Sequence, residues 1–106
     1  MQVIATKITQ NPAIVKFELD EIIVRTENFE FKNIDETQNS PLAKQLFFLP
    51  FVKTVYISGN FIAIEKFSIV EWEDVQEDVA NQINEFITNR GVIIQVDETK
   101  TKKQPI

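Results

Sequence analysis

The stretch KTVYISGNFIAIEK, which runs from residue 53 to residue 66, constrains the fold of this chain more than any other. Gly59 and Asn60 form a two-residue loop signal, because glycine supplies the positive φ that tight hairpin turns require. Such a loop sets four apolar residues across from one another on one face of the two strands: Ile57 opposite Ile62, and Val55 opposite Ile64. A register slip of one residue would scatter them, so the sequence predicts an amphipathic hairpin.

The preceding stretch, NSPLAKQLFFLP, predicts a short helix with both ends marked. The Ser40 hydroxyl can cap the first turn, and Pro41 suits the first helical position because its missing N–H would be unpaired there anyway. Pro50 ends the helix by forcing Leu49 out of helical geometry. Ser40 is also a hydroxyl nucleophile by type, but the chain has no histidine to activate it and no nucleophile-elbow spacing. The helix cap is therefore the favoured interpretation.

From about Glu71 the apolar spacing changes to that of a longer helix. One stripe collects its apolar residues: Trp72, Val75, Val79, Ile83, Phe86 and Ile87. Ser68 and Glu71 fit a capping box, although a helix start nearer Trp72 fits as well. Gly91 fits the position just past the helix end. Because Trp72 begins the apolar stripe, we expect it to pack in the core rather than to stack on a ligand.

Extended segments are predicted before and after these helices. VIATKI begins at residue 3, and NPAIVKFEL follows a turn at Asn11 and Pro12. EIIVRTENFEFKNI reads as further extended chain, with Phe29 and Phe31 on one face, and VIIQV is a candidate last strand from residue 92. The predicted fold is α+β, with two layers: a small, mostly antiparallel sheet and two helices packed on one face.

The length of 106 residues fits one domain, which we place at residues 1–96. Residues 97–106 read as a polar tail or linker. Their composition fits a true C-terminus and a cut at a domain boundary equally well.

Composition argues against most chemistry. The chain has no cysteine and no histidine, which removes disulfides, thiolate nucleophiles, zinc fingers and the commonest general base near neutral pH. A net charge of −5 disfavours binding to nucleic acid and to anionic membranes. No apolar stretch approaches the roughly 18 residues of a membrane span, and the start of the chain does not resemble a signal peptide. We therefore expect a cytoplasmic protein that is not an enzyme.

Acidic residues are the remaining candidates for metal binding or acid–base catalysis. One cluster opens the long helix: Glu71, Glu73, Asp74, Glu77 and Asp78. Carboxylates four positions apart on a helix could share an ion, but a solvated helix face is the favoured interpretation because no other ligands point there. Asp20 and Glu21 are neighbours in a predicted turn and are expected to sit in water. The sequence thus predicts no catalytic residue, no metal site and no cofactor bound by this chain.

Phe48 and Phe51 are the candidate partner-binding residues. Phe48 points away from the apolar face of the short helix, and Phe51 sits in the turn after it. Exposed apolar surface of this kind tends to mark an interaction site. The alternative is that both rings pack under the first strands.

Several of these stretches, taken in order, resemble the N-terminal domain of the NifU-like (Nfu) iron–sulfur cluster scaffold proteins. The resemblance covers about residues 3–87 and rests on TQNPAIVKF at 9–17, SPLA at 40–43, Leu46-Phe47, Val52, Val55, GNFI at 59–62, Lys66 and Trp72. Ala13, Phe51, Asn60 and Ala63 depart from the family pattern, which has asparagine, glycine, aspartate and threonine there. These departures leave the predicted fold intact.

The resemblance implies a domain that assists assembly or delivery of iron–sulfur clusters. It implies contacts with scaffold or recipient proteins, or with the cluster-bearing domain of the same protein. In that family the cluster is held by a separate Cys-x-x-Cys domain, and nothing in this cysteine-free chain matches that motif. The tail would then begin the linker to that domain. The alternative is a free-standing protein-interaction domain unrelated to iron–sulfur metabolism.

Overall fold

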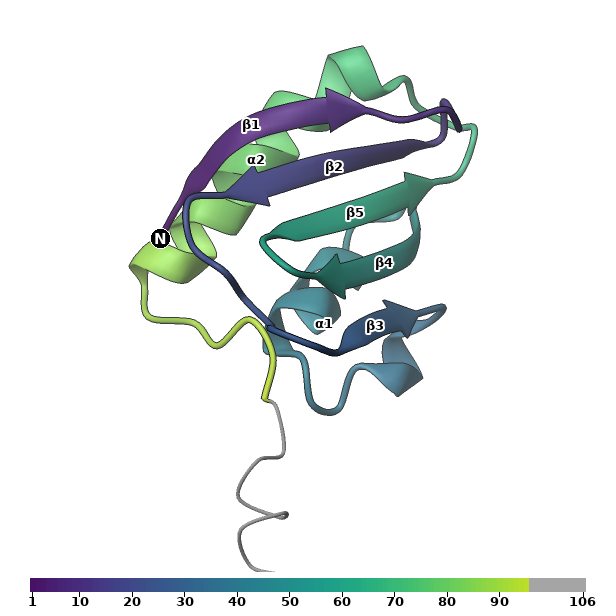
Figure 1. Cartoon of the computed structure of the whole chain (residues 1–106). Helices are drawn as coiled ribbons and strands as arrows, with labels where there is room; N and C mark the ends of the chain where they lie inside the picture. The colour runs from purple at the N-terminus through teal and green to yellow at the C-terminus, as the bar shows by residue number, and fades with distance from the viewer. Residues whose placement is uncertain (96–106) are drawn as a thin grey trace, which may run out of the picture.

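A five-stranded antiparallel sheet with both α-helices on one side is the framework of the fold (Figure 1). The computed structural model describes residues 1–95. Its elements are β1 (Val3–Ile8), β2 (Ile14–Leu19), β3 (Asn28–Phe31), the 3-10 turn η1 (Ile34–Glu36), α1 (Pro41–Phe47), β4 (Val52–Ser58), β5 (Phe61–Lys66) and α2 (Trp72–Thr88). The strands lie in the order β1-β2-β5-β4-β3, and all neighbours are antiparallel. The predicted two-layer α+β fold is therefore confirmed, whereas the predicted tail over 97–106 lies outside the described residues.

The β4–β5 hairpin has the predicted register. Val55 pairs with Ile64 and Ile57 with Ile62, and these four side chains are buried on the helix-covered face. Gly59 has a φ of 52°, and a positive φ at the first loop residue alone is the pattern of a type II′ turn. The hairpin forms the centre of the sheet because β2 then pairs with β5, and β3 with β4.

The core fills the space between this face and the helices. Its buried members include Val15, Phe17 and Leu19 of β2, Leu42, Ala43 and Leu46 of α1, and Trp72, Val79 and Ile83 of α2. Helix α2 packs against β1 and β2, whereas α1 packs against β4. The two helices thus divide the sheet between them, in agreement with their separate positions behind it in Figure 1.

The structure confirms the predicted start of α1 at Ser40 and Pro41. It also decides between the two predicted starts of α2. The Ser40 Oγ accepts a hydrogen bond from the Ala43 amide at 3.1 Å, and Pro41 is the first helical residue. Helix α2 begins at Trp72 with Glu71 as its N-cap, without a side-chain cap. The capping box with Ser68 is therefore wrong, because the helix begins one turn later than that box requires.

The sequence predicts Gly91 as the residue just past the end of α2, but the structure places Arg90 in that position. The left-handed residue is Arg90, with a φ of 64°. The Arg90 amide donates to the Ile87 carbonyl at 2.9 Å, and the Gly91 amide donates to the Phe86 carbonyl at 2.8 Å. These two bonds form a Schellman motif. A Cβ at residue 91 would lie 2.4 Å from the Cε2 atom of Phe86, so the Phe86 ring would have to move to admit it.

The predicted last strand from residue 92 does not form over the described residues 92–95. Instead the chain returns across the start of α1. The Gln95 amide donates to the Asn39 carbonyl at 2.6 Å, and Ile93 is buried in the core. Phe29 and Phe31 share one face of β3 as predicted, with parallel rings 6.4 Å apart.

Candidate functional site

Phe48 is exposed, which agrees with one of the two interpretations that the sequence left open. It is the C-cap residue of α1, and its side chain is 64% exposed. Leu42 and Leu46 bury the opposite side of this short helix against the sheet. Since helical spacing turns Phe48 away from them, no part of the core is available to cover its ring.

Phe51 is buried, so the expectation that it shares an exposed surface with Phe48 is wrong. Its side chain is only 9% exposed and belongs to the core. The turn after α1 is closed by a hydrogen bond from the Val52 amide to the Leu49 carbonyl, 3.2 Å long. The Phe51 ring meets the Trp72 indole edge to face, with 6.3 Å between ring centres and an angle of 87°. Its burial agrees with the alternative that the sequence left open, and the ring partner shown is Trp72 at the start of α2.

Two other exposed apolar residues lie in the connection before α2. Phe67 is 45% exposed and Ile69 is 67% exposed. The Phe67 amide donates to the Phe51 carbonyl at 2.8 Å, which ties this connection to the one that carries Phe48. We call Phe48, Phe67 and Ile69 the apolar corner. Sequence reasoning missed Phe67 and Ile69, although apolar residues in a connection outside both the strand and the helix pattern are a readable signal.

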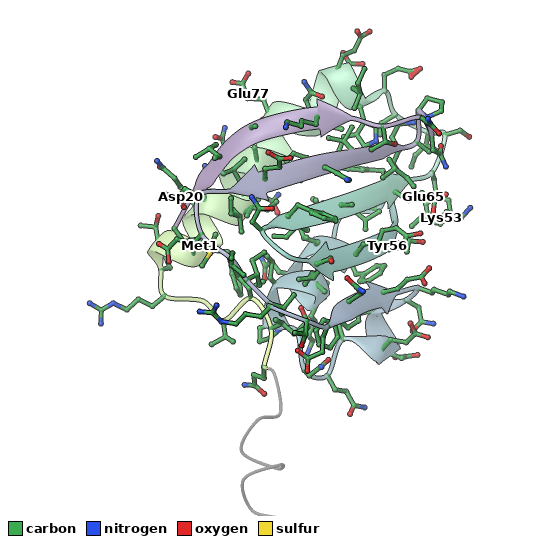
Figure 2. All side chains as sticks on the ribbon, viewed as in Figure 1. Met1, Asp20, Lys53, Tyr56, Glu65 and Glu77 are labelled. Carbon is green, nitrogen blue, oxygen red and sulfur yellow. The ribbon has the colours of Figure 1, made fainter. Side chains whose placement is uncertain are left out.

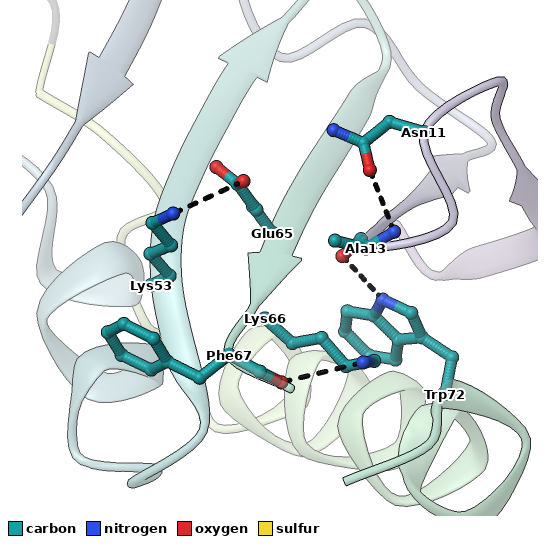
Figure 3. A network of polar contacts seen from close by, with 7 residues as sticks. All are labelled: Asn11, Ala13, Lys53, Glu65, Lys66, Phe67 and Trp72. Atoms are coloured by element: carbon teal, nitrogen blue, oxygen red, sulfur yellow. Dashed lines mark hydrogen bonds and ion pairs between the residues drawn. The ribbon is translucent and has the colours of Figure 1, made fainter. Parts of the chain in front are cut away.

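Hydrogen bonds join the start of α2 to the turn before β2 (Figure 3). The Trp72 Nε1 atom donates to the Ala13 carbonyl at 2.7 Å, and the Phe17 and Trp72 rings meet edge to face with centres 5.9 Å apart. Ala13 is itself held by the predicted turn, because its amide donates to the Asn11 Oδ1 atom at 2.9 Å. Trp72 is thus a core residue, as predicted, and its indole fixes the start of α2 against the entry to β2.

Polar groups border this region without forming a reactive cluster. The Lys53 Nζ and Glu65 Oε2 atoms are 3.7 Å apart, and the Lys66 Nζ donates to the Phe67 carbonyl at 3.4 Å (Figure 3). Exposed apolar side chains bordered by charged groups are typical of protein-binding surfaces.

The other candidate residues lie apart from the apolar corner. Ser40 is fully buried and its hydroxyl is engaged as a cap. Asp20 and Glu21 are exposed, and Asp20 accepts a hydrogen bond from the Gln2 amide at 2.9 Å. Among residues 1–95, no group of three or more histidine, cysteine, aspartate or glutamate side chains is placed to hold a metal ion. Within the same range neither helix is long and apolar enough to cross a membrane.

Comparison with curated proteins identifies relatives. A family model described as "Scaffold protein Nfu/NifU N terminal" matches residues 4–90. The human protein named "NFU1 iron-sulfur cluster scaffold homolog, mitochondrial" is 30% identical over 97 residues, which make up 91% of this chain and 38% of that protein. The protein of the same name from Drosophila willistoni is 31% identical over 87 residues, 81% of this chain and 30% of that protein. The chain thus spans about a third of the length of these relatives.

Solved structures share the fold. A NifU-like protein from Saccharomyces cerevisiae, solved by solution NMR, has a TM-score of 0.72 at 25% identity, with 87% of this chain and 85% of that chain covered. The crystal structure of protein SAV1430 from Staphylococcus aureus has a TM-score of 0.67 at 22% identity, with 78% of this chain and 99% of that chain covered. The second likeness shows the fold alone. Because the family model covers most of the chain, the chain belongs to the Nfu/NifU N-terminal scaffold family.

Proposed function

We propose that this chain is the non-catalytic N-terminal module of an iron–sulfur cluster assembly or delivery scaffold, and that it acts through protein–protein or interdomain contacts. The observation that carries the proposal is the apolar corner, which lies on a domain of the Nfu/NifU N-terminal family. Its three members are exposed to solvent, whereas the neighbouring Phe51 is buried in the core. Surface of this kind gains stability when a partner covers it.

The partner that fits best is the cluster-bearing Cys-x-x-Cys domain of the same scaffold, or a protein that receives the cluster. A cluster held by thiolates needs shielding from water, so an apolar contact surface beside it suits transfer between proteins. This chain contributes shape and apolar area, and the thiolates come from elsewhere, since it has no cysteine. A cytoplasmic location remains a prediction, and the word "mitochondrial" stands in the names of the two relatives described above.

The surface is tested by NMR. Unlabelled cluster-bearing domain from an Nfu scaffold of the same organism is added to the ¹⁵N-labelled chain. We expect amide shift changes at Phe48, Phe67 and Ile69, with little change at the hairpin loop around Gly59. Changes confined to other surfaces would rule out the apolar corner as the contact.

The coding sequence beyond Ile106 separates the proposal from its alternative. A Cys-x-x-Cys domain that follows in the same reading frame supports a scaffold module with interdomain contacts. A stop codon at that point, together with no binding to the organism's scaffold proteins, would favour a free-standing interaction domain unrelated to iron–sulfur metabolism.

A further inference from the structure

The face of the sheet that turns away from both helices carries a hollow of about 540 Å³. Side chains from β2, β5, β4 and β3 line it, and most of the lining is apolar. Ile14, on the same face of β2 as Lys16, belongs to this lining. We call this hollow the open-face groove. It shares no residue with the apolar corner, so it is a second surface.

Strand register places one straight row of residues across the groove. Lys16 of β2 pairs with Ala63 of β5, Ala63 pairs with Tyr56 of β4, and Tyr56 pairs with Glu30 of β3. Directly paired residues project from the same side of a sheet, so these four side chains lie side by side. Tyr56 is labelled on β4 in Figure 2, in which both helices lie behind the sheet. The row begins with an ammonium group and ends with a carboxylate.

Ala63 makes the floor of the groove. Its methyl group is flanked by the larger side chains of Lys16 and Tyr56 on the neighbouring strands, and by Phe61 two positions earlier on its own strand. The Lys16 Nζ lies 4.5 Å from the centre of the Phe61 ring, which holds the lysine along one wall. Ala63 is only 4% exposed, so a side chain that enters from outside contacts mainly the three larger side chains around it.

The charges at the two ends of the row are not neutralised by ion pairs within the described residues. Among residues 1–95, the ion pairs on this face join Lys7 to Glu18 at 3.2 Å and Lys53 to Glu65 at 3.7 Å. Neither Lys16 nor Glu30 takes part in an ion pair within that range. Three strand intervals separate these two residues, a distance of about 14 Å.

We propose that the open-face groove binds an extended segment of a partner protein that carries an acidic, an apolar and a basic side chain at alternate positions. The acidic group lies at Lys16, the apolar side chain enters above Ala63, and the basic group lies at Glu30. Alternate residues of an extended chain project from one side, and four residue steps span about 13 Å, close to the length of the row. A second copy of this domain is the other occupant to test, because Lys16 of one copy could face Glu30 of the other; the dimerisation measurement below separates the two.

The probe is the peptide acetyl-Asp-Ala-Leu-Ala-Lys-amide, and the matched control replaces its two charged residues with Asn and Gln. Each is titrated into the full ¹⁵N-labelled chain. We expect saturable amide shifts around Lys16, Tyr56 and Ala63, and binding of the neutral peptide about fivefold weaker. Equal binding of both peptides, or shifts that avoid this row, would overturn the proposal.

A charge exchange tests the orientation of the peptide. Lys16→Glu should lose the probe and gain binding to acetyl-Lys-Ala-Leu-Ala-Lys-amide, whereas the wild type should prefer the original peptide. Ala63→Leu should fill the groove and abolish both interactions, with an unchanged circular dichroism spectrum as the folding control. If Lys16→Glu does not alter peptide preference, or if the wild type dimerises and Ala63→Leu makes it monomeric, the partner-segment proposal is wrong.

Discussion

The hydroxyl group of Ser40 joins the start of α1 to Ile93, in the segment that follows α2. Its Oγ atom accepts from the Ala43 amide at 3.1 Å and donates to the Ile93 carbonyl at 2.7 Å. Both bonds are buried. A single side chain therefore caps one helix and anchors the chain segment that leaves the other, across 53 positions of sequence.

Ser40→Ala should lower the free energy of unfolding by about 2 kcal/mol, because a cap is lost and a buried carbonyl loses its donor. Urea unfolding followed by circular dichroism measures the change. Ser68→Ala is the matched control, since Ser68 is exposed and is not the cap of α2. Its effect should stay within about 0.5 kcal/mol. Equal losses in the two variants would contradict the cap assignment.

Arg90→Gly should stabilise the domain by about 0.5–1 kcal/mol. Arg90 holds the left-handed position of the Schellman motif, where glycine avoids the steric cost of a Cβ atom. Thermal unfolding of the two proteins measures the gain. Arg90→Ala serves as the control because it removes the charge and retains the Cβ. Stabilisation by alanine equal to that by glycine would show that backbone strain is not the cause.

Phe51→Ala should cost about 3–4 kcal/mol, whereas Phe48→Ala should change stability by less than about 0.5 kcal/mol. The two phenylalanines lie three positions apart, but only Phe51 packs on Trp72. Chemical denaturation of both variants gives the comparison. A larger loss for Phe48→Ala than for Phe51→Ala would mean that their burial is assigned the wrong way round.

Tyr56 should titrate above its ordinary pKa of 10.0. Burial is the main cause that raises the pKa of this phenol, and the carboxylates of Glu30 and Glu65 add to it. The folded chain then holds the proton more tightly than the unfolded chain. The stability that Tyr56 contributes is complete below pH 10 and is lost as the pH rises through the folded pKa.

Tyrosinate absorbance tests this directly, because Tyr56 is the only tyrosine. Glu30→Gln should lower the midpoint, and Tyr56→Phe should weaken the decline of stability above pH 10. A midpoint at or below 10 in the folded wild type would contradict the position of Tyr56 beside these carboxylates.

Local rules were enough to predict the hairpin and the short helix. The loop at Gly59 fixes the register, and Ser40, Pro41 and Pro50 mark the helix ends, so each element is specified by neighbours in sequence. The start of α2 remained ambiguous because Ser68 offers a cap that tertiary packing overrides: the Trp72 indole bonds to Ala13 and begins the helix there. The return of residues 92–95 to α1 depends on Ser40 and Asn39, far away in sequence.

The candidate site was predicted only in part for the same reason. Helical spacing suffices to expose Phe48. The burial of Phe51 depends on its meeting Trp72, and the place of Phe67 beside it depends on a hydrogen bond between two connections. The open-face groove follows from pairing between strands that are distant in sequence, and only the β4–β5 part of that pairing could be read locally.

Isothermal titration of the cluster-bearing scaffold domain into this chain tests the proposed contact most directly. Phe48→Asp should weaken binding about tenfold or more while the free energy of unfolding stays within about 0.5 kcal/mol of the wild type. Ile22→Asp is the matched control: Ile22 is 59% exposed, and the next residue is bonded to the hairpin loop at the far end from the apolar corner. It should bind like the wild type. Wild-type affinity of the folded Phe48→Asp protein would contradict the account.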